Sequence, residues 1–235
     1  MVSGENFKDI LLRGELSYKK SIVVSFLNPY SYPIIAQHRE ILNGVNYWFS
    51  DGSLLCFISN LFRRKEDKIT RASFDFSSIA SDVFSNCVDF GIPVALVGGN
   101  EEEIVKAREN ISLKYKGINI VFYRDGYFTY DDYDQISKEI ISSGAKVVIV
   151  GMGTPLQEKF SIALSKRKFN GFIFTCGGFL TQTSRKLDYY STFTKKTGLR
   201  WLQRAFSDKH VRKRLTNQYP RFVFGYLYSR AFGNK

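Results

Sequence analysis

A short segment in the second half of the chain has the residue types of an anion-binding turn. Residues 147–150 are consecutive apolar residues, as in a strand covered on both faces. Gly151 and Gly153 follow, and glycines let backbone N–H groups approach a ligand closely. Pro155 is suited to the start of a helix, whose amino end offers unpaired N–H groups and a partial positive charge. A diphosphate or a carboxylate could therefore bind here, although the same pattern also occurs in turns that only connect a strand to a helix.

Two polar residues earlier in the chain could act at the same edge of a parallel sheet. Asp51 follows a short apolar stretch and precedes an expected helix, so its carboxylate could act as a general base or could cap that helix. The local sequence favours the cap. Asn28 follows an expected strand and precedes a proline, where it is either a turn residue or a group that contacts a ligand. Because the carboxyl ends of parallel strands share one edge, we expect Asp51, Asn28 and Gly151 to lie where ligands collect.

The elements that must position these residues alternate between strands and helices. Apolar runs bounded by turn residues recur at 21–26, 92–97, 118–123, 146–150 and 172–175. Stretches of helix length and mixed polarity lie between them, at 31–42, 52–62, 76–90, 101–113, 133–142 and 156–168. This alternation predicts an α/β fold with a largely parallel, Rossmann-like sheet flanked by helices.

A second glycine-rich turn, at Gly98 and Gly99, is expected to be structural. Asn100 can cap the helix that follows, and glutamates at 101–103 occupy its first turn, where the helix dipole favours acids. These acids would repel a phosphate, so we do not expect an anion at this turn.

The carboxyl-terminal part of the chain differs in charge and composition. Eleven of the 34 Lys and Arg residues lie in 195–235, against one acid, Asp208, and eight aromatic residues are interleaved with them. We therefore predict a catalytic domain over 1–194 and a basic-aromatic appendage over 195–235, after a polar segment at 181–197 that could be a hinge. The appendage is expected to form short helices at 198–206, 209–217 and 221–232. Such a mixture suits an anionic membrane surface or a phosphate-bearing ligand, with nucleic acid or a solvated basic helix pair as alternatives.

Several kinds of site are disfavoured by what the sequence lacks. There is no Gly-x-x-x-x-Gly-Lys-Ser/Thr loop of a nucleoside triphosphatase. Neither His38 nor His210 has a partner at metal-ligand spacing, and Asp131 and Asp132 stand at the start of an expected helix, where acids are common. We therefore expect no metal site. The scattered cysteines are expected to be reduced core residues. No signal-peptide pattern or bilayer-length apolar run is found, so a cytoplasmic chain is expected.

Ordered motifs resemble those of the WecG/TagA/CpsF family of glycosyltransferases, which act in bacterial surface-polysaccharide synthesis. The resemblance covers about residues 20–220, and the block at 150–159 is its most specific part. The segments that carry it are 26–28 (Phe-Leu-Asn), 51–52 (Asp-Gly), 97–101 (Val-Gly-Gly-Asn-Glu), 125–128 (Asp-Gly-Tyr-Phe), 150–159 (Val-Gly-Met-Gly-Thr-Pro-Leu-Gln-Glu-Lys), 176–179 (Cys-Gly-Gly-Phe), 199–204 (Leu-Arg-Trp-Leu-Gln-Arg) and 212–214 (Arg-Lys-Arg).

The resemblance implies an activity and a set of partners. The family transfers a sugar from a nucleotide diphosphate donor, usually UDP-linked, to a saccharide on a polyprenyl diphosphate lipid, with inversion and without a required metal or other cofactor. Such an enzyme would associate peripherally with the inner face of the plasma membrane, and no nucleic acid partner is expected. A homo-oligomer whose interface borders the site would suit the high aromatic content.

The resemblance also implies roles for individual residues. Asp51 aligns with the proposed general base that removes the proton of the acceptor hydroxyl, and Asn28 would help to place the sugar or the acceptor. The glycines of the specific block, with Pro155 and Gln157, would lie at the nucleotide pocket. Two arginines of the appendage, Arg212 and Arg214, would complete the site at the membrane.

Parts of the sequence are also compatible with two other functions. A non-catalytic nucleotide-binding or nucleic-acid-binding module could use the same basic appendage. A nicotinamide-dependent oxidoreductase is suggested only by Gly151 and Gly153, and the third glycine of that motif is missing because position 156 is Leu. The segment that follows Gly178 departs from the family pattern, and so does Arg200. The resemblance therefore does not imply a particular donor sugar.

Overall fold

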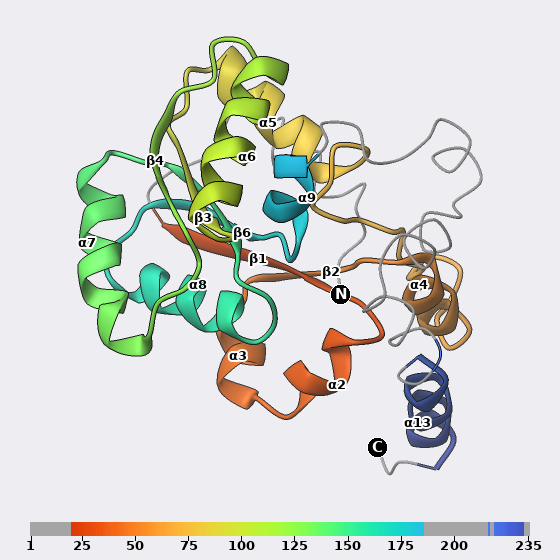
Figure 1. The fold of residues 1–235 in the computed structure, drawn as a ribbon. Helices are drawn as coiled ribbons and strands as arrows, with labels where there is room; N and C mark the ends of the chain where they lie inside the picture. The colour runs from red at the N-terminus through yellow and green to blue at the C-terminus, as the bar shows by residue number, and fades with distance from the viewer. Residues whose placement is uncertain (1–19, 186–215, 217–218, 233–235) are drawn as a thin grey trace.

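The computed structural model describes residues 20–185, 216 and 219–232, and Figure 1 shows their arrangement. Within these residues the strands form one sheet, made of β1 (Ser21–Leu27), β2 (Tyr47–Ser50), β3 (Val94–Gly98), β4 (Ile120–Arg124), β5 (Val147–Gly151) and β6 (Gly171–Thr175). The strand order is β2-β1-β6-β5-β3-β4, and every neighbouring pair is parallel. The prediction of a parallel, Rossmann-like α/β fold is thereby confirmed.

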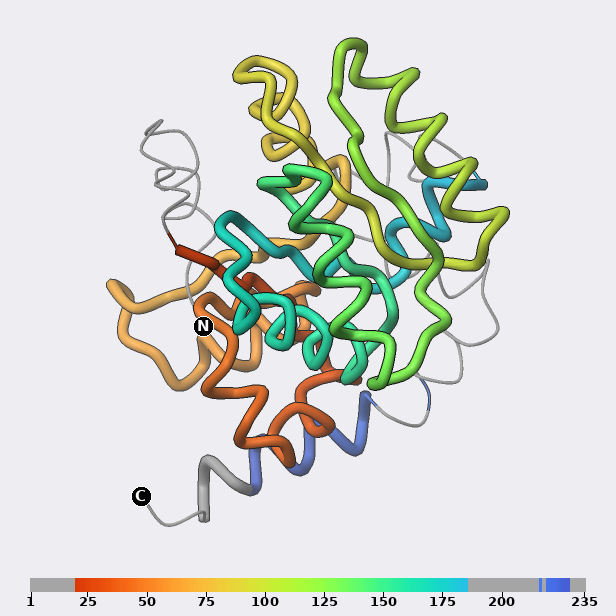
Figure 2. Tube along the Cα trace, turned by 90° about the vertical axis from the view of Figure 1, so that its left-hand side faces the viewer, coloured from red at the N-terminus to blue at the C-terminus, as the bar shows by residue number. Residues whose placement is uncertain are grey.

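Helices cover both faces of the sheet. They are α2 (Ser31–Ala36), α3 (Arg39–Gly44), α4 (Ser53–Asn60), α5 (Ile79–Asp89), α6 (Glu101–Lys114), the 3-10 helix η1 (Tyr130–Asp132), α7 (Tyr133–Ser142), α8 (Leu156–Lys166), α9 (Phe179–Arg185) and α13 (Tyr219–Phe232). Helices α5, α6 and α9 pack on one face, in the core that contains Phe84 and Phe174. Helices α7 and α8 pack on the other face with α2 to α4 and α13, in the core that contains Phe160. Figure 2 shows α13 beside the α2–α3 segment.

Adjacent strands at the middle of the sheet send their following helices to opposite faces. Helix α8 follows β5 and buries Phe160 on one face, whereas α9 follows β6 and buries Phe179 and Leu180 on the other. In parallel sheets the carboxyl edge opens into a ligand-binding crevice where this divergence occurs. A ligand-binding crevice is therefore expected at the β5–α8 turn and the β6–α9 loop.

Two details of the sequence prediction were wrong. The helix expected over 31–42 is two helices, because His38 leaves the helical region at φ −117° and ψ 85°. The polar segment from residue 181 does not begin as a linker, since α9 continues to Arg185. Thr183 is buried there, and its carbonyl accepts a hydrogen bond from Asn110 Nδ2 of α6 at 2.8 Å.

Other expectations hold in the described part of the chain. Asn100 caps α6: its side chain accepts from the backbone N–H of Glu103, whose own side chain accepts in return from Asn100 N–H. Cys56 and Cys87 are buried free thiols, whereas Cys176 is a partly buried free thiol at the edge of the core. Burial raises the pKa of Cys87 to about 12. The last expected helix is present as α13, whereas 198–206, nearly all of 209–217 and the boundary at 194 lie outside the described residues.

Candidate active site

Asp51 lies at the carboxyl end of β2, next to the end of β1. Its backbone N–H donates to the carbonyl of Leu27 at 2.7 Å, which fixes the residue beside Asn28. Gly52, with a positive φ of 107°, occupies the N-cap position of α4. Asp51 is therefore not the N-cap residue of α4, although the local sequence had indicated that role. Its carboxylate instead pairs with a basic side chain.

The carboxylate of Asp51 pairs with Arg71, which the sequence analysis missed. Arg71 Nη2 lies 3.4 Å from Asp51 Oδ1 and 2.9 Å from Asp75 Oδ2, in the loop between α4 and α5. The backbone N–H of Ala72 donates to the carbonyl of Ser50 at 3.0 Å, which holds this loop against the end of β2. The side chains of Asp51 and Arg71 are 30% and 25% exposed, so solvent and ligands can reach them.

Asp75 is held by several hydrogen bonds. Burial opposes the charged form of Asp75, but Arg71 and the hydroxyl groups of Ser73 and Ser77 outweigh it and lower the pKa of Asp75. Ser73 Oγ donates to Asp75 Oδ2 at 2.6 Å, and the N–H of Ser77 donates to Oδ1 at 2.8 Å. Of the two carboxylates on Arg71, Asp51 is thus the more exposed one.

Asn28 forms the turn that follows β1. Its Oδ1 accepts hydrogen bonds from the N–H groups of Tyr30 and Ser31 at 2.9 and 3.0 Å, and its own N–H donates to Ser31 Oγ at 3.0 Å. Asn28 is therefore a turn residue, and its contact with a ligand stays a prediction. Since Leu27 bonds to Asp51, Asn28 and Asp51 lie at the same edge, as expected.

The glycines of the central turn are required by close backbone contacts. A Cβ on Gly151 would lie 2.8 Å from the carbonyl oxygen of Gly177, and one on Gly98 would lie 2.4 Å from the oxygen of Gly151. Gly153 differs, because a Cβ there would meet no atom within 4 Å and only its φ of 77° favours glycine. Gly151 is thus needed for packing, whereas the space next to Gly153 is open.

A buried polar network joins this turn to β1 and β6. Gln157 is 3% exposed, and its Oε1 accepts from the N–H of Gly177 at 3.0 Å while its Nε2 donates to Glu158 Oε1 at 2.8 Å. Glu158 Oε1 also accepts from Ser25 Oγ at 3.0 Å, and Ser25 Oγ accepts from Thr175 at 2.8 Å. The side chain of Gln157 therefore braces the β5–α8 turn against the β6–α9 loop.

Glu158 is a second residue that the sequence analysis did not select. It is 1% exposed, and burial raises its pKa, although the hydrogen bonds from Gln157, Ser25 and Thr154 oppose that shift. Pro155 stands at the N-cap position of α8 rather than in its first turn, after a cis peptide bond. Arg212 and Arg214 lie outside the described residues.

The chain matches known proteins over most of its length. A model of the glycosyl transferase WecG/TagA/CpsF family matches residues 6–235. The chain belongs to this family. It is also 37% identical over 205 residues to the UDP-Gal:alpha-D-GlcNAc-diphosphoundecaprenol beta-1,4-galactosyltransferase of Shigella boydii, covering 87% of this chain and 85% of the relative. The resemblance inferred from the motifs is confirmed, and the chain is a glycosyltransferase rather than a non-catalytic module.

Within this glycosyltransferase, the acidic pair Asp131-Asp132 serves the start of a helix. Asp132 Oδ2 accepts from the N–H and the hydroxyl group of Thr129 at 2.8 and 3.0 Å. Over the described ranges, no group of three His, Cys, Asp or Glu side chains is placed to hold a metal ion. In the same residues, no helix has the length and apolar character needed to cross a membrane.

Proposed function

We propose that this glycosyltransferase moves a sugar from a UDP-sugar to a saccharide on a polyprenyl diphosphate, with Asp51 as the general base. The observation that carries the proposal is the partly exposed carboxylate of Asp51 at the carboxyl edge of the sheet, beside Arg71 and Asn28. The name of the Shigella boydii relative, which gives a UDP-linked donor and a diphosphoundecaprenol acceptor, supports both substrate classes.

The reaction is an inverting displacement in one step. Asp51 removes the proton of the acceptor hydroxyl group while the oxygen of that hydroxyl group bonds to the anomeric carbon of the donor sugar. At the same time the bond between the anomeric carbon and the oxygen of UDP breaks. A retaining enzyme that forms a covalent intermediate would use a second carboxylate as nucleophile. Asp75, which shares Arg71 with Asp51, already accepts hydrogen bonds from Arg71, Ser73 and Ser77. A single displacement with inversion therefore suits this site.

The leaving diphosphate would bind at the amino end of α8. The helix dipole stabilises an anion there, and the space beside Gly153 is open. An acid in the first turn would normally oppose this. Burial raises the pKa of Glu158, which favours its neutral form and reduces that opposition. Together with the arginines expected from the appendage, this would allow transfer without a metal.

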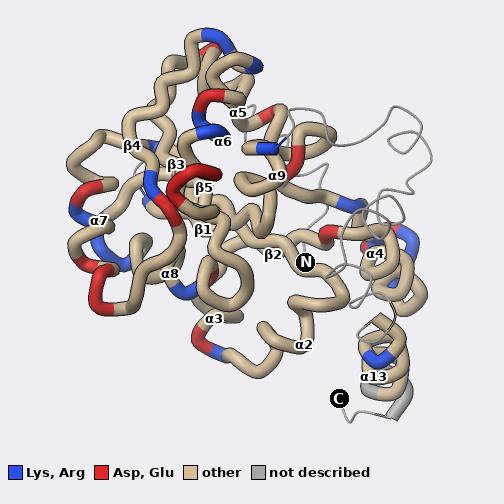
Figure 3. The backbone as a smooth tube through the Cα atoms, in the orientation of Figure 1, with Lys and Arg blue, Asp and Glu red and all other residues tan. Residues whose placement is uncertain are grey.

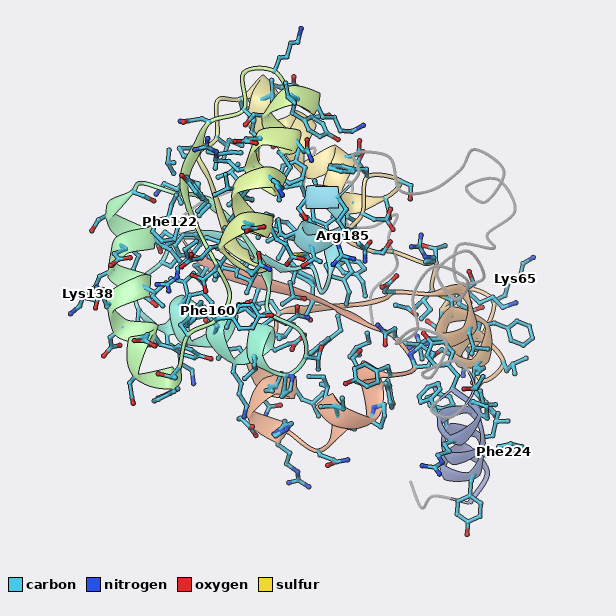
Figure 4. The ribbon with its side chains drawn as sticks, viewed as in Figure 1. Lys65, Phe122, Lys138, Phe160, Arg185 and Phe224 are labelled. Carbon is cyan, nitrogen blue, oxygen red and sulfur yellow. The ribbon has the colours of Figure 1, made fainter. Side chains whose placement is uncertain are left out.

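An apolar and basic surface supports peripheral association with an anionic membrane. Phe57 and Leu61 of the α4 region are 64% and 58% exposed, and Phe224 of α13 is 74% exposed. Basic residues lie around α4 and on α13 in Figure 3, and Lys65 and Phe224 project from the same side of the molecule in Figure 4. Aromatic side chains with nearby cations are suited to the interface of an anionic bilayer.

The test measures UDP release with a panel of UDP-sugars, starting from UDP-Gal, and a GlcNAc-diphosphate lipid. Wild type, Asp51→Asn and the control Asp131→Asn, which changes an exposed carboxylate of η1, are compared. We expect acceptor-dependent release that falls by about 10²–10⁴-fold in Asp51→Asn, the usual contribution of general-base catalysis, and that persists in the control. Retained turnover in Asp51→Asn would refute the base, and no release from any donor would refute the substrate class.

A further inference from the structure

An apolar groove lies between α2 and α13, next to the candidate site. Its volume is about 650 Å³, and its lining includes Pro29, Tyr30, Pro33, Ile34, Arg221 and Gly225. Binding sites for small apolar ligands have this size range and this mixture of apolar walls with a few polar groups. The groove is therefore large enough to hold part of a ligand.

The walls of the groove are held together by aromatic contacts. Tyr32 of α2 packs edge-to-face on Phe222 and Tyr226 of α13, with ring centroids 5.4 and 5.7 Å apart. Phe222 and Tyr226 are one turn apart, so they lie on the same face of α13. Both are buried, and they anchor α13 against α2.

Gly225 leaves the groove open on this same face. It lies three residues after Phe222, so it also faces α2, and a Cβ there would meet no atom within 4 Å. Glycine in a helix interior is unfavourable compared with alanine. The position is thus one where a side chain would fit the backbone but would fill the groove.

The lining of the groove begins directly after Asn28, at the carboxyl edge of the sheet. Pro29 and Tyr30 directly follow Asn28, whose Oδ1 accepts from the N–H of Tyr30. Among the described residues that line the groove the only cation is Arg221, in the first turn of α13, and no carboxylate of the described residues pairs with it in a salt bridge. An apolar channel with one guanidinium group complements an apolar chain that begins at a diphosphate.

We propose that this groove binds the isoprene units next to the diphosphate of the acceptor lipid, with Arg221 on the diphosphate. This inference rests on the proposed function, because it takes the polyprenyl diphosphate acceptor as given. It adds a lipid-binding site that selects the acceptor by its chain as well as by its sugar. The nucleotide donor has no apolar chain and would not use the groove.

The first experiment compares two acceptors that carry the same saccharide diphosphate, one on a farnesyl chain and one on an ethyl group. Each buried methylene group changes affinity by about fourfold, so wild type should have a KM at least tenfold lower for the farnesyl acceptor. Gly225→Trp should raise the KM for that acceptor by about tenfold or more and leave the ethyl acceptor unchanged. The control Leu113→Trp adds a tryptophan at an exposed position of α6 on the other face of the sheet, and it should change neither KM. Equal effects of Gly225→Trp on both acceptors, or none on either, would overturn the proposal.

A binding measurement separates failure of the groove from failure of the proposed function. Farnesyl diphosphate, without any donor, should bind wild type and Leu113→Trp and bind Gly225→Trp at least tenfold more weakly. Arg221→Gln should weaken binding of farnesyl diphosphate several-fold and leave farnesol binding unchanged. If transfer occurs but farnesyl diphosphate binds all variants equally, the groove inference is wrong and the function stands. If Gly225→Trp instead disrupts a dimer of wild type, a second copy occupies the groove and the inference is also wrong.

Discussion

Replacing Gln157 by alanine should destabilise the fold, and not only weaken substrate binding, because it removes hydrogen bonds that join the β5–α8 turn to the β6–α9 loop. The side chain is 3% exposed and makes three hydrogen bonds at the carboxyl edge of the sheet, of which the one to Thr154 Oγ1, at 3.4 Å, is the longest. It accepts from the N–H of Gly177 at 3.0 Å and donates to Glu158 Oε1 at 2.8 Å. In Gln157→Ala, the N–H of Gly177 loses its acceptor and the carboxyl group of Glu158 loses a donor.

The magnitude follows from these two losses. A buried polar group left without its partner costs about 1–3 kcal/mol. Glu158 keeps its hydrogen bonds from Ser25 and Thr154, so its loss belongs at the lower end of that range. We therefore expect Gln157→Ala to lower the free energy of unfolding by about 2–4 kcal/mol, out of the roughly 5–15 kcal/mol typical of a native protein.

Urea unfolding of wild type and Gln157→Ala measures this change directly. The matched control is Gln135→Ala on α7, because Gln135 is exposed and its Nε2 donates to Glu139 at 3.0 Å. The control should lose no more than about 0.5 kcal/mol, as for other exposed pairs one helical turn apart. If Gln157→Ala unfolds like wild type while its KM for the donor rises, Gln157 acts on the ligand and the bracing argument is refuted.

Two further predictions concern Glu158 and the surface around α4. The raised pKa of Glu158 means that the folded state holds the proton of this carboxyl group more tightly than the unfolded state does. The free energy of unfolding of wild type should therefore fall as pH rises from about 4.3 through the raised pKa. Glu158→Gln removes this titration, so the difference in urea midpoint between the variant and wild type should increase over that pH range and then level off. A difference independent of pH would contradict it. Wild type should sediment with anionic vesicles in a salt-sensitive manner, and the double variant Phe57→Ser, Leu61→Ser should bind at least about tenfold more weakly because it buries less apolar surface. The equally exposed Leu113→Ser is the control, and unchanged binding of the double variant would exclude α4 from the membrane surface.

The fold could be predicted from the sequence because its strands and helices follow local patterns. Helix α7 begins and ends where its polarity pattern indicated, and α6 has a capping signal at Asn100 that the structure forms. The prediction failed where a backbone departure decides the outcome. His38 divides a continuous helical pattern without a proline or glycine, and α9 is recognisable only from its packing against α6.

The candidate site was only partly predictable, for a different reason. Asp51, Asn28 and Gly151 share an edge because parallel strands place their carboxyl ends together, and this follows from the order of elements. Arg71 joins them through a loop whose position depends on the bond between Ala72 and Ser50. No periodicity marks such a loop. Their catalytic and binding roles stay predictions.

The burial of Glu158 could not be predicted from the local sequence either. An acid in the first turn of a helix normally indicates an exposed residue that favours the dipole. Here it is buried because Ser25, which lies 133 residues earlier, supplies a hydrogen bond from β1. Only the tertiary structure brings these two residues together.

Strand β1 connects the polar network with the proposed base. Ser25, which bonds to Glu158, lies two residues before Leu27, whose carbonyl accepts from the N–H of Asp51. A change that loosens the network should therefore affect both the β5–α8 turn, where the donor diphosphate is proposed to bind, and the position of Asp51. As a result, kcat and the KM for the donor should change together. A change in the groove beside α2 lies on the other side of Asn28 and should alter the acceptor KM alone. The pattern of kinetic constants thus separates the brace from the lipid site, even where both variants reduce the overall rate.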